Sequence, residues 1–326
     1  MRILLTTTSY QDTPGPHHAQ LQASGFEVVK ARGPLGESAL LELLNPPSSH
    51  GQPGFDGLLC GDDALSPRVI DAALAAPTPL RVISKYGVGL DSIAVDHARS
   101  HGLPVLYTPG VNETSVAEHA LGLMLAVARR LPTHVAGVKR GAWDRQTGVE
   151  LSGRLLAILG VGRVGRALGE RAAALGMSLV GYGRSWDDAW AQRLGVRRAE
   201  SAEAALEAGQ VVSLHLPLTP ETRHLVRAET IERVPERAIL INTARGGLVD
   251  EAAVAEACRS GRLHGYGADV LEHEPVRSGH VFAELDNVVV TPHIASRTQA
   301  AVGRQAVRAT TNLIEYLTGG SDYVQA

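Results

Sequence analysis

The stretch LLAILGVGRVGRALGERAAALG, residues 155–176, decides how this chain folds. Its first five residues are apolar and predict a buried strand, and its alanine- and arginine-rich second half favours a helix. Between them Gly160, Gly162 and Gly165 have the spacing G-x-G-x-x-G. The first glycine permits a tight turn, the second lets a pyrophosphate approach the backbone, and the third lets the helix pack closely on the strand. The segment therefore predicts a dinucleotide-binding loop at the N-terminus of a helix.

The rest of the chain alternates in the same way between short β-rich runs and helical stretches. Strands separated by helices indicate right-handed crossovers and parallel sheets. With 326 residues the chain is longer than a domain with a single hydrophobic core usually is, so we expect two domains of this α/β class. The expected strands are Ile3–Thr6, Phe26–Val29, Gly57–Cys60, Arg81–Ser84, Leu155–Leu159, Ser178–Tyr182, Val211–Leu214, Ala238–Asn242 and Val288–Thr291.

Composition and charge exclude several classes of protein. The formal net charge is -3, so the chain has neither a basic field for nucleic acid nor a polybasic footprint for a membrane surface. No stretch approaches the ~20 apolar residues of a membrane span, and the start MRILLTTTSY turns polar too soon for a signal peptide. We therefore expect a cytoplasmic protein.

The end of the strand expected at Ser178–Tyr182 bears on which dinucleotide binds. NAD-dependent proteins usually carry an acidic residue there, which accepts a hydrogen bond from the ribose 2′-hydroxyl. Here Gly183, Arg184 and Ser185 follow the strand, and the first carboxylate is that of Asp187. Arg184 and Ser185 could bind a 2′-phosphate, so the sequence favours NADP over NAD. Alternatively, Arg184 is a solvated loop residue that stacks on adenine.

Several other segments of the chain occur in an order that is specific for one protein family. They read KYGVGLD at 85–91, TPGVN and SVAE within 108–118, NTARGGLVDE at 242–251, DVLEHEP at 269–275 and TPHIAS at 291–296. With the glycine loop, they make the chain resemble the D-isomer-specific 2-hydroxyacid dehydrogenase family, which includes phosphoglycerate dehydrogenase and glyoxylate/hydroxypyruvate reductase. The resemblance covers nearly the whole chain. It implies an enzyme that moves a hydride between NAD(P)H and C2 of a small D-2-hydroxy or 2-keto acid.

The resemblance implies a catalytic trio of Arg245, Glu274 and His293. Hydride addition leaves negative charge on the substrate's carbonyl oxygen, so a fixed cation and a proton donor are needed beside it. The planar guanidinium of Arg245 can hold the carboxylate and polarise the carbonyl. His293 serves as acid in reduction and base in oxidation, while Glu274 fixes its tautomer and favours the imidazolium form.

The resemblance also implies which residues hold the two ligands. Backbone N–H groups at Val88 and Gly89 are implied to bind the substrate carboxylate together with Arg245. The N–H groups of Arg163 and Val164 face the pyrophosphate at the helix N-terminus. Other cofactor contacts are implied for Leu216, Thr243 and Asp269, the last through the nicotinamide carboxamide.

The resemblance implies two Rossmann-like, doubly wound parallel-sheet domains with a cleft between them. We expect a flavodoxin-like substrate domain from residues 1–103 and 294–326, and a dinucleotide-binding domain from residues 104–293. A long helix expected from Ser115 to Arg130 is apolar on more than one face, which favours a homodimer contact. Alternatively, those apolar residues only pack against the glycine-loop domain.

Two alternatives remain open from the sequence. Lys85 or Arg81 could neutralise a phosphate or phosphonate on the substrate, although Lys85 is equally typical of a surface charge at a strand end. A cofactor-sensing binding protein of the co-repressor type would share the fold and could keep the trio.

We expect no metal, because no Cys/His cluster has metal-ligand spacing and Arg245 supplies a positive charge. The chain ends soon after its last expected helix, so we expect no regulatory domain beyond it.

Overall fold

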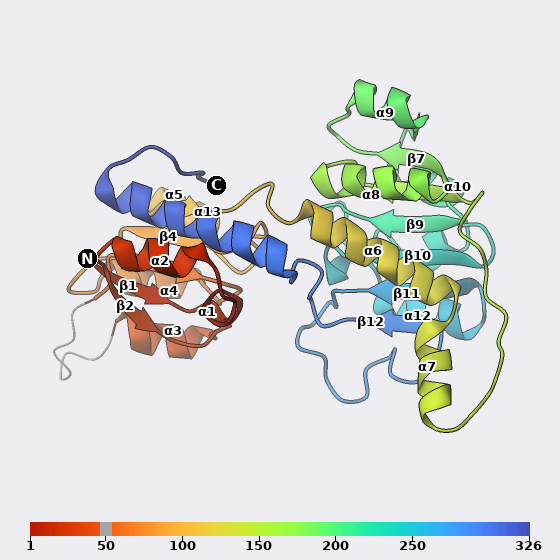
Figure 1. Cartoon of the computed structure of the whole chain (residues 1–326), viewed down its shortest axis with the longest axis horizontal. Helices are drawn as coiled ribbons and strands as arrows, with labels where there is room; N and C mark the ends of the chain where they lie inside the picture. The colour runs from red at the N-terminus through yellow and green to blue at the C-terminus, as the bar shows by residue number, and fades with distance from the viewer. Residues whose placement is uncertain (46–53) are drawn as a thin grey trace. The chain divides into compact units, whose positions relative to one another are not determined.

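The computed structural model describes residues 1–45 and 54–326 and divides the chain into two compact units (Figure 1). The first unit consists of residues 1–112 and 297–326, and the second of residues 113–296. The loop expected between Asn45 and Gly54 falls on residues outside the described ranges. Within those ranges, no helix is long and apolar enough to cross a membrane.

The first unit is built on a parallel sheet with helices on both faces. In its described residues five strands follow the order β2-β1-β3-β4-β5. Leu4 and Leu58 point to a core with helices α3, α4 and α5, whereas Ile3 and Leu59 point to a second core with α13. Helix α13 lies beside α2 and β4 in Figure 1. The elements are β1 (Arg2–Leu5), α1 (Thr8–Asp12), α2 (Pro16–Ala23), β2 (Glu27–Lys30), α3 (Glu37–Leu44), β3 (Gly57–Cys60), α4 (Pro67–Leu74), β4 (Val82–Lys85), α5 (Val95–Ser100), β5 (Val105–Leu106) and α13 (Gln299–Thr318).

The second unit has the same architecture with a seven-stranded parallel sheet, in the order β12-β11-β10-β9-β6-β7-β8. Ala157 and Leu240 face a core with helices α10 and α12, and Ile158 and Ile241 face a core with α6 and α8. This period-two alternation gives each strand two buried faces, which explains the apolar runs in the sequence. The elements are α6 (Glu113–Ala128), α7 (Leu131–Lys139), β6 (Leu155–Leu159), α8 (Arg163–Ala174), β7 (Ser178–Tyr182), α9 (Asp188–Leu194), β8 (Arg197–Arg198), α10 (Ala202–Ala208), β9 (Val211–Leu214), α11 (Ala228–Ile231), β10 (Ala238–Asn242), the 3₁₀ turn η2 (Gly246–Leu248), α12 (Glu251–Arg259), β11 (Leu263–Ala268) and β12 (Val288–Val290).

The predicted α/β class with two doubly wound parallel sheets is confirmed, but the sequence missed three strands, β5, β8 and β11. Strand β11 contains Gly265 and Gly267, which usually weaken a strand. Here they admit helix α6, because a β-carbon on Gly265 would lie 2.7 Å from Val127 Cγ1 and one on Gly267 would lie 3.1 Å from Leu123 Cβ. Helix α6 packs on β10 and β11, as Figure 1 shows.

Both boundaries at which the chain passes from one unit to the other differ from the expected ones. The first lies after Asn112 instead of residue 103, because β5 pairs with β4 and keeps the following segment with the first sheet. The second lies after Ser296 instead of residue 293. There the N–H groups of Ile294 and Ala295 donate to the Asp269 carboxylate, which ties them to the second unit.

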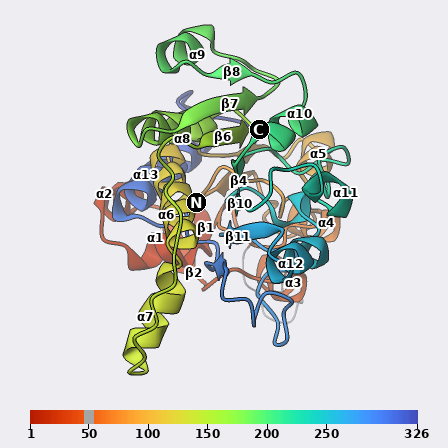
Figure 2. The same cartoon turned by 90° about the vertical axis from the view of Figure 1, so that its right-hand side faces the viewer.

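Most apolar residues of α6 pack inward, but Leu125 is 37% exposed. Leu123, Met124 and Val127 are at most 4% exposed and belong to the core under the sheet. The core accounts for these three residues, and the expected contact between subunits through α6 stays a prediction. Exposed apolar side chains occur also on α7, which has no buried residue and projects away from its sheet in Figures 1 and 2. They include Leu131, Val135 and Val138.

Candidate active site

The second sheet reverses its winding between β6 and β9, which pair although β7 and β8 come between them in the chain. From β6 the chain continues outward through β7 and β8, and from β9 it continues the other way through β10, β11 and β12. In open α/β sheets, ligands bind at the carboxyl ends of the strands beside such a switch point. The predicted catalytic and cofactor residues all follow strands β6, β7 and β9–β12.

The glycine loop after β6 has room for a close ligand. Gly160 has a φ of +108°, and a β-carbon there would lie 2.4 Å from the carbonyl oxygen of His215. A β-carbon on Gly165 would lie 2.1 Å from the Gly160 carbonyl oxygen, so α8 needs glycine to start this close to β6. At Gly162, by contrast, a β-carbon would meet no described atom within 4 Å. Gly162 caps α8 without a side-chain hydrogen bond, which fits an anion on the helix N-terminus.

The other predicted cofactor residues lie around this loop on the same sheet. Arg163 is exposed and Val164 half-buried at the start of α8. Leu216 is half-buried after β9 and packs against the core. Thr243 follows β10, and its buried Oγ1 has no hydrogen-bond partner among the residues that the structure describes. A buried hydroxyl of this kind fits a polar contact with a bound dinucleotide.

The turn after β7 presents donors rather than a carboxylate. Arg184 and Ser185 are exposed there. The carboxylate of Asp187 accepts hydrogen bonds from the Trp190 N–H at 2.9 Å and from Arg166 Nη1 at 2.7 Å. The bond from Trp190 and the nearby Arg166 charge lower the pKa of Asp187. Asp187 is therefore ionised, and its two oxygens are bound to Trp190 of α9 and Arg166 of α8.

The predicted catalytic residues follow three adjacent strands. Arg245 comes three residues after β10, His293 three residues after β12, and Glu274 follows β11, which lies between those strands. Since all strands are parallel, their carboxyl ends meet at one edge of the sheet. The fold thus places three side chains that are distant in sequence at the same edge of one sheet.

Glu274 and His293 are joined by a hydrogen bond. Glu274 Oε2 lies 2.8 Å from His293 Nδ1, and both side chains are more than a third exposed. Glu274 Oε1 accepts the backbone N–H of Leu271 at 2.9 Å. Burial acts to raise the pKa of Glu274, but the bonds from His293 and Leu271 outweigh it, and the net pKa is lowered. The carboxylate is therefore ionised and favours a proton on Nδ1 of His293.

Comparison with known proteins decides the family. The family described as "D-isomer specific 2-hydroxyacid dehydrogenase, NAD binding domain" matches residues 121–295. This chain belongs to the D-isomer-specific 2-hydroxyacid dehydrogenase family. It is 38% identical to a glyoxylate reductase from Thermofilum pendens over 273 residues, covering 81% of this chain and 79% of that protein. A crystal structure of a Thermus thermophilus protein superposes with a TM-score of 0.88, at 37% identity and over the full length of both chains.

Some family relatives are much longer than this chain. It is 40% identical to D-3-phosphoglycerate dehydrogenase from Methanocaldococcus jannaschii over 224 residues, which cover 68% of this chain but 43% of that protein. The chain thus spans less than half of that relative's length. The predicted family and fold are confirmed by these comparisons.

In this dehydrogenase family member, the loop that carries Arg245 is fixed from both sides. Asn242 Nδ2 donates to the Arg245 carbonyl oxygen at 2.8 Å, and Arg245 Nη1 donates to the Ala244 carbonyl oxygen at 2.6 Å. A β-carbon on Gly246 would lie 2.0 Å from the carbonyl carbon of Leu271. The Arg245 loop therefore packs directly on the residue whose N–H binds Glu274.

Asp269 has a structural role besides the cofactor contact that the resemblance implies, which stays a prediction. Its side chain is 1% exposed and accepts hydrogen bonds from the Thr291 hydroxyl and from the N–H groups of Ile294 and Ala295. Burial acts to raise its pKa, but hydrogen bonds from His119, Thr291 and these N–H groups lower it overall. An ionised carboxylate with these partners fixes the loop that carries His293, whose own N–H donates to the Asp269 carbonyl oxygen.

Val88 and Gly89, the predicted substrate-binding residues, lie in the first unit, after β4. Val88 is exposed and Gly89 is half-buried. The loop is held at its base, where Gly87 N–H donates to the Thr108 hydroxyl at 3.1 Å and Thr108 N–H returns a bond to the Gly87 carbonyl oxygen. The loop thus presents its backbone at the carboxyl end of a parallel strand.

Sequence reasoning missed two groups of side chains. His119 on α6 lies 2.8 Å from the Thr291 hydroxyl through its Nε2 atom and so supports the Asp269 network. Asp71, His97 and His101 lie together in the first unit. The spacing of four residues between the two histidines was a usable signal, since it places both on one side of a helix. Asp71 comes from another helix, so its approach depends on the tertiary fold.

Proposed function

We propose that this chain is an NAD(P)-dependent D-2-hydroxyacid dehydrogenase that reduces small 2-keto acids. The observation that carries the proposal is the Glu274–His293 pair, at 2.8 Å, on the strand ends that also hold Arg245 and the glycine loop. An imidazole backed by a carboxylate is a general acid and base, and a guanidinium is a fixed cation for an oxyanion.

In the proposed reaction, a dihydronicotinamide cofactor bound at the glycine loop would supply the hydride for C2 of the keto acid. Arg245 binds the substrate carboxylate and stabilises negative charge on the carbonyl oxygen. His293 transfers a proton from Nε2 to that oxygen, which yields the hydroxyl group. Glu274 accepts the Nδ1–H bond throughout and stabilises the charged ring before transfer. We propose further that backbone N–H groups at Val88 and Gly89 bind the carboxylate.

For the substrate we propose a small 2-keto acid without a phosphate, such as glyoxylate or hydroxypyruvate. Lys85 is the cation nearest in sequence to the proposed carboxylate loop, and its side chain is 2% exposed. Its Nζ donates to Asp62 Oδ1 at 2.6 Å and to the Gly61 carbonyl oxygen at 2.5 Å. Arg81 precedes β4, at the opposite end of the strand from this loop. These positions disfavour both residues as ligands of a phosphate or phosphonate.

For the cofactor we propose a preference for NADP(H). Arg184 and Ser185 are exposed after β7, and the carboxylate that follows them is engaged by Arg166 and Trp190. A 2′-phosphate would gain a charge-assisted bond from Arg184 and meet no repelling carboxylate from Asp187. We expect Arg184→Asp to reduce kcat/KM for NADPH at least about tenfold and to leave kcat/KM for NADH within about threefold. If the ratio of kcat/KM for NADPH to kcat/KM for NADH did not change, the proposed role of Arg184 would be overturned.

The function is tested by following absorbance at 340 nm with NADPH and NADH against 2-keto acids of graded size and charge. We expect turnover of glyoxylate and hydroxypyruvate, faster with NADPH, and little turnover of a phosphorylated keto acid. His293→Ala serves as the matched inactive control. A chain that binds NADPH but turns over no keto acid would instead be a cofactor-sensing protein of the co-repressor type.

We also propose that the chain forms a homodimer through α7. Leu131, Val135 and Val138 are 47%, 53% and 56% exposed, and Trp143 just beyond the helix is 77% exposed. A second copy of the same face would cover these apolar side chains. Sedimentation should give a dimer for the wild type and a shift to monomer for Val135→Glu with Val138→Glu. A monomeric wild type would refute the proposal.

We propose a cytoplasmic location because of the state of the two cysteines. Cys60 and Cys258 are buried, unpaired thiols, which suits a reducing compartment.

A further inference from the structure

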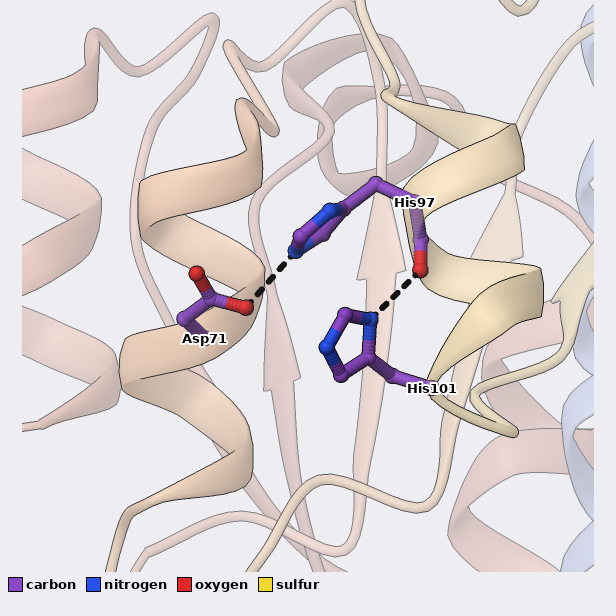
Figure 3. A group of neighbouring side chains, drawn as sticks. All are labelled: Asp71, His97 and His101. Carbon is purple, nitrogen blue, oxygen red and sulfur yellow. Dashed lines mark hydrogen bonds and ion pairs between the residues drawn. The ribbon is translucent and has the colours of Figure 1, made fainter.

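Three side chains of kinds that bind metal ions meet on the first unit. His97 and His101 come from α5 and the residue that caps it, and Asp71 comes from the neighbouring helix α4 (Figure 3). One ligand atom from each lies within 4.8 Å of the other two. The two imidazole rings lie side by side with their centroids 4.4 Å apart.

Hydrogen bonds fix the tautomer of His101. Ser100 Oγ donates its proton to the His97 carbonyl oxygen at 2.8 Å, so at the 3.1 Å contact with His101 Nδ1 the hydroxyl can only accept. His101 Nδ1 also lies 2.9 Å from the His97 carbonyl oxygen, which is an acceptor. Nδ1 therefore carries the proton, and Nε2 carries the lone pair that a metal ion needs. Metal-bound histidines in proteins are oriented by the same kind of second hydrogen bond.

Asp71 and His97 are joined by a hydrogen bond, and their two facing atoms lie closer together than two ligand atoms of one metal ion would. His97 Nε2 lies 2.7 Å from Asp71 Oδ1, as Figure 3 shows. Bonds of about 2.0–2.1 Å at tetrahedral angles would place two ligand atoms roughly 3.3 Å apart. An ion that replaces the shared proton would thus need a small separation of these groups. Asp71 is 56% exposed and His97 27%, so both side chains have space to adjust.

We propose that Asp71, His97 and His101 bind one divalent ion of the zinc, nickel or copper class. Two imidazoles and a carboxylate suit these borderline metals, whereas magnesium and calcium prefer oxygen ligands alone. Binding displaces the Nε2 proton of His97 into solvent and leaves the remaining coordination positions to water. The ion links α4 to α5, so it stabilises the folded first unit without entering the chemistry proposed above.

The test is a titration of the EDTA-treated full chain with ZnCl₂ in a calorimeter, repeated with NiCl₂ and MgCl₂. We expect one saturable zinc or nickel site per chain and no competition by magnesium. His97→Gln and His101→Gln should each weaken zinc binding roughly tenfold or more, since each removes one of three ligands. His134→Gln, on α7 of the other unit, is the matched control and should bind zinc as the wild type does.

Thermal unfolding provides a second readout that does not depend on activity. Zinc should raise the Tm of the wild type and of His134→Gln, EDTA should reverse the rise, and Asp71→Asn should reduce it. Circular dichroism without metal identifies any variant that fails to fold, and His101→Gln, exposed at a helix end, is the one expected to fold in any case. Unchanged zinc affinity in both histidine variants, or no saturable binding up to about 1 mM, would overturn the proposal.

Discussion

His293 Nδ1 lies 2.8 Å from Glu274 Oε2, although the two residues are 19 positions apart in sequence. The contact exists because β11 and β12 are adjacent and parallel, so the loops after them leave the same edge of the sheet. Asp269, at the end of β11, holds the His293 loop through the N–H groups of Ile294 and Ala295. Strand pairing and a buried carboxylate thus position the imidazole before any ligand binds.

Replacing His293 with Ala should lower kcat for keto-acid reduction by about 10²–10⁴-fold, because the proton donor to the carbonyl oxygen is removed. The Kd for NADPH should stay within about threefold of the wild type, since the glycine loop that is proposed to hold the pyrophosphate is unaltered. Steady-state kinetics and a fluorescence titration of NADPH measure the two quantities. An equal loss of turnover and of cofactor binding would show that His293 supports the cofactor instead.

Glu274→Gln should move the pH profile of reduction toward lower pH. The pKa of Glu274 is lowered, mainly by its bond to His293 against the effect of burial, so the wild-type carboxylate is ionised at neutral pH and stabilises a charged imidazole. Glutamine removes that charge, so the imidazole loses its proton at a lower pH and kcat/KM for reduction declines earlier as pH rises. Glu272→Gln, which alters a carboxylate bound to Arg223 and His224, is the matched control. Coincident profiles for Glu274→Gln and the wild type would contradict the proposed role.

Arg245→Lys should lower kcat/KM for small keto acids by about 10²–10³-fold, even though the positive charge is kept. A single ammonium cannot reproduce the two parallel hydrogen bonds of a guanidinium to a carboxylate. The variant loses the bond from Arg245 Nη1 to the Ala244 carbonyl oxygen but keeps the bond from Asn242 to the carbonyl oxygen of residue 245, which holds the backbone of the loop. Initial rates over a range of keto-acid concentrations measure the effect. Kinetics like those of the wild type would exclude bidentate binding.

The sequence predicted those features that depend on local pattern or on a motif. The apolar runs at Leu155–Leu159 and Val211–Leu214 are strands β6 and β9 as expected, because buried parallel strands need no polar alternation. Strand β11 was missed because its glycines only make sense once α6 is packed on it.

Tertiary contacts account for the rest. The partners of Asp269 come from residues more than twenty positions away, and Asp71 reaches the α5 histidines only because α4 and α5 pack together. The apolar surface of α6 gave no means of distinguishing burial in its own unit from burial against a second subunit. The packing of Leu123 and Val127 on the sheet accounts for those two residues.

His215 should make the chain less stable as the pH falls from about 6.5 to about 4. Burial lowers the pKa of His215 to about 4, and its Nε2 lies 2.9 Å from the Ser213 hydroxyl between the strand end and the glycine loop. In the unfolded chain the ring takes up a proton near its ordinary pKa of 6.5, whereas the folded chain resists protonation until the lower value. The unfolded state therefore binds more protons across this window, so the free energy of unfolding contributed by the neutral ring is present above pH 6.5 and lost on acidification.

Replacing His215 with Gln removes the titrating ring, so the urea midpoint of the variant should change less between pH 6.5 and pH 4 than that of the wild type. His17 and His264, whose pKa values burial also lowers, leave a residual slope in the same window. The comparison uses the difference between the two pH values within each protein, so any constant loss from altered packing cancels. If the midpoint of the variant fell as steeply as that of the wild type, the neutral His215 ring would not be a source of the acid sensitivity.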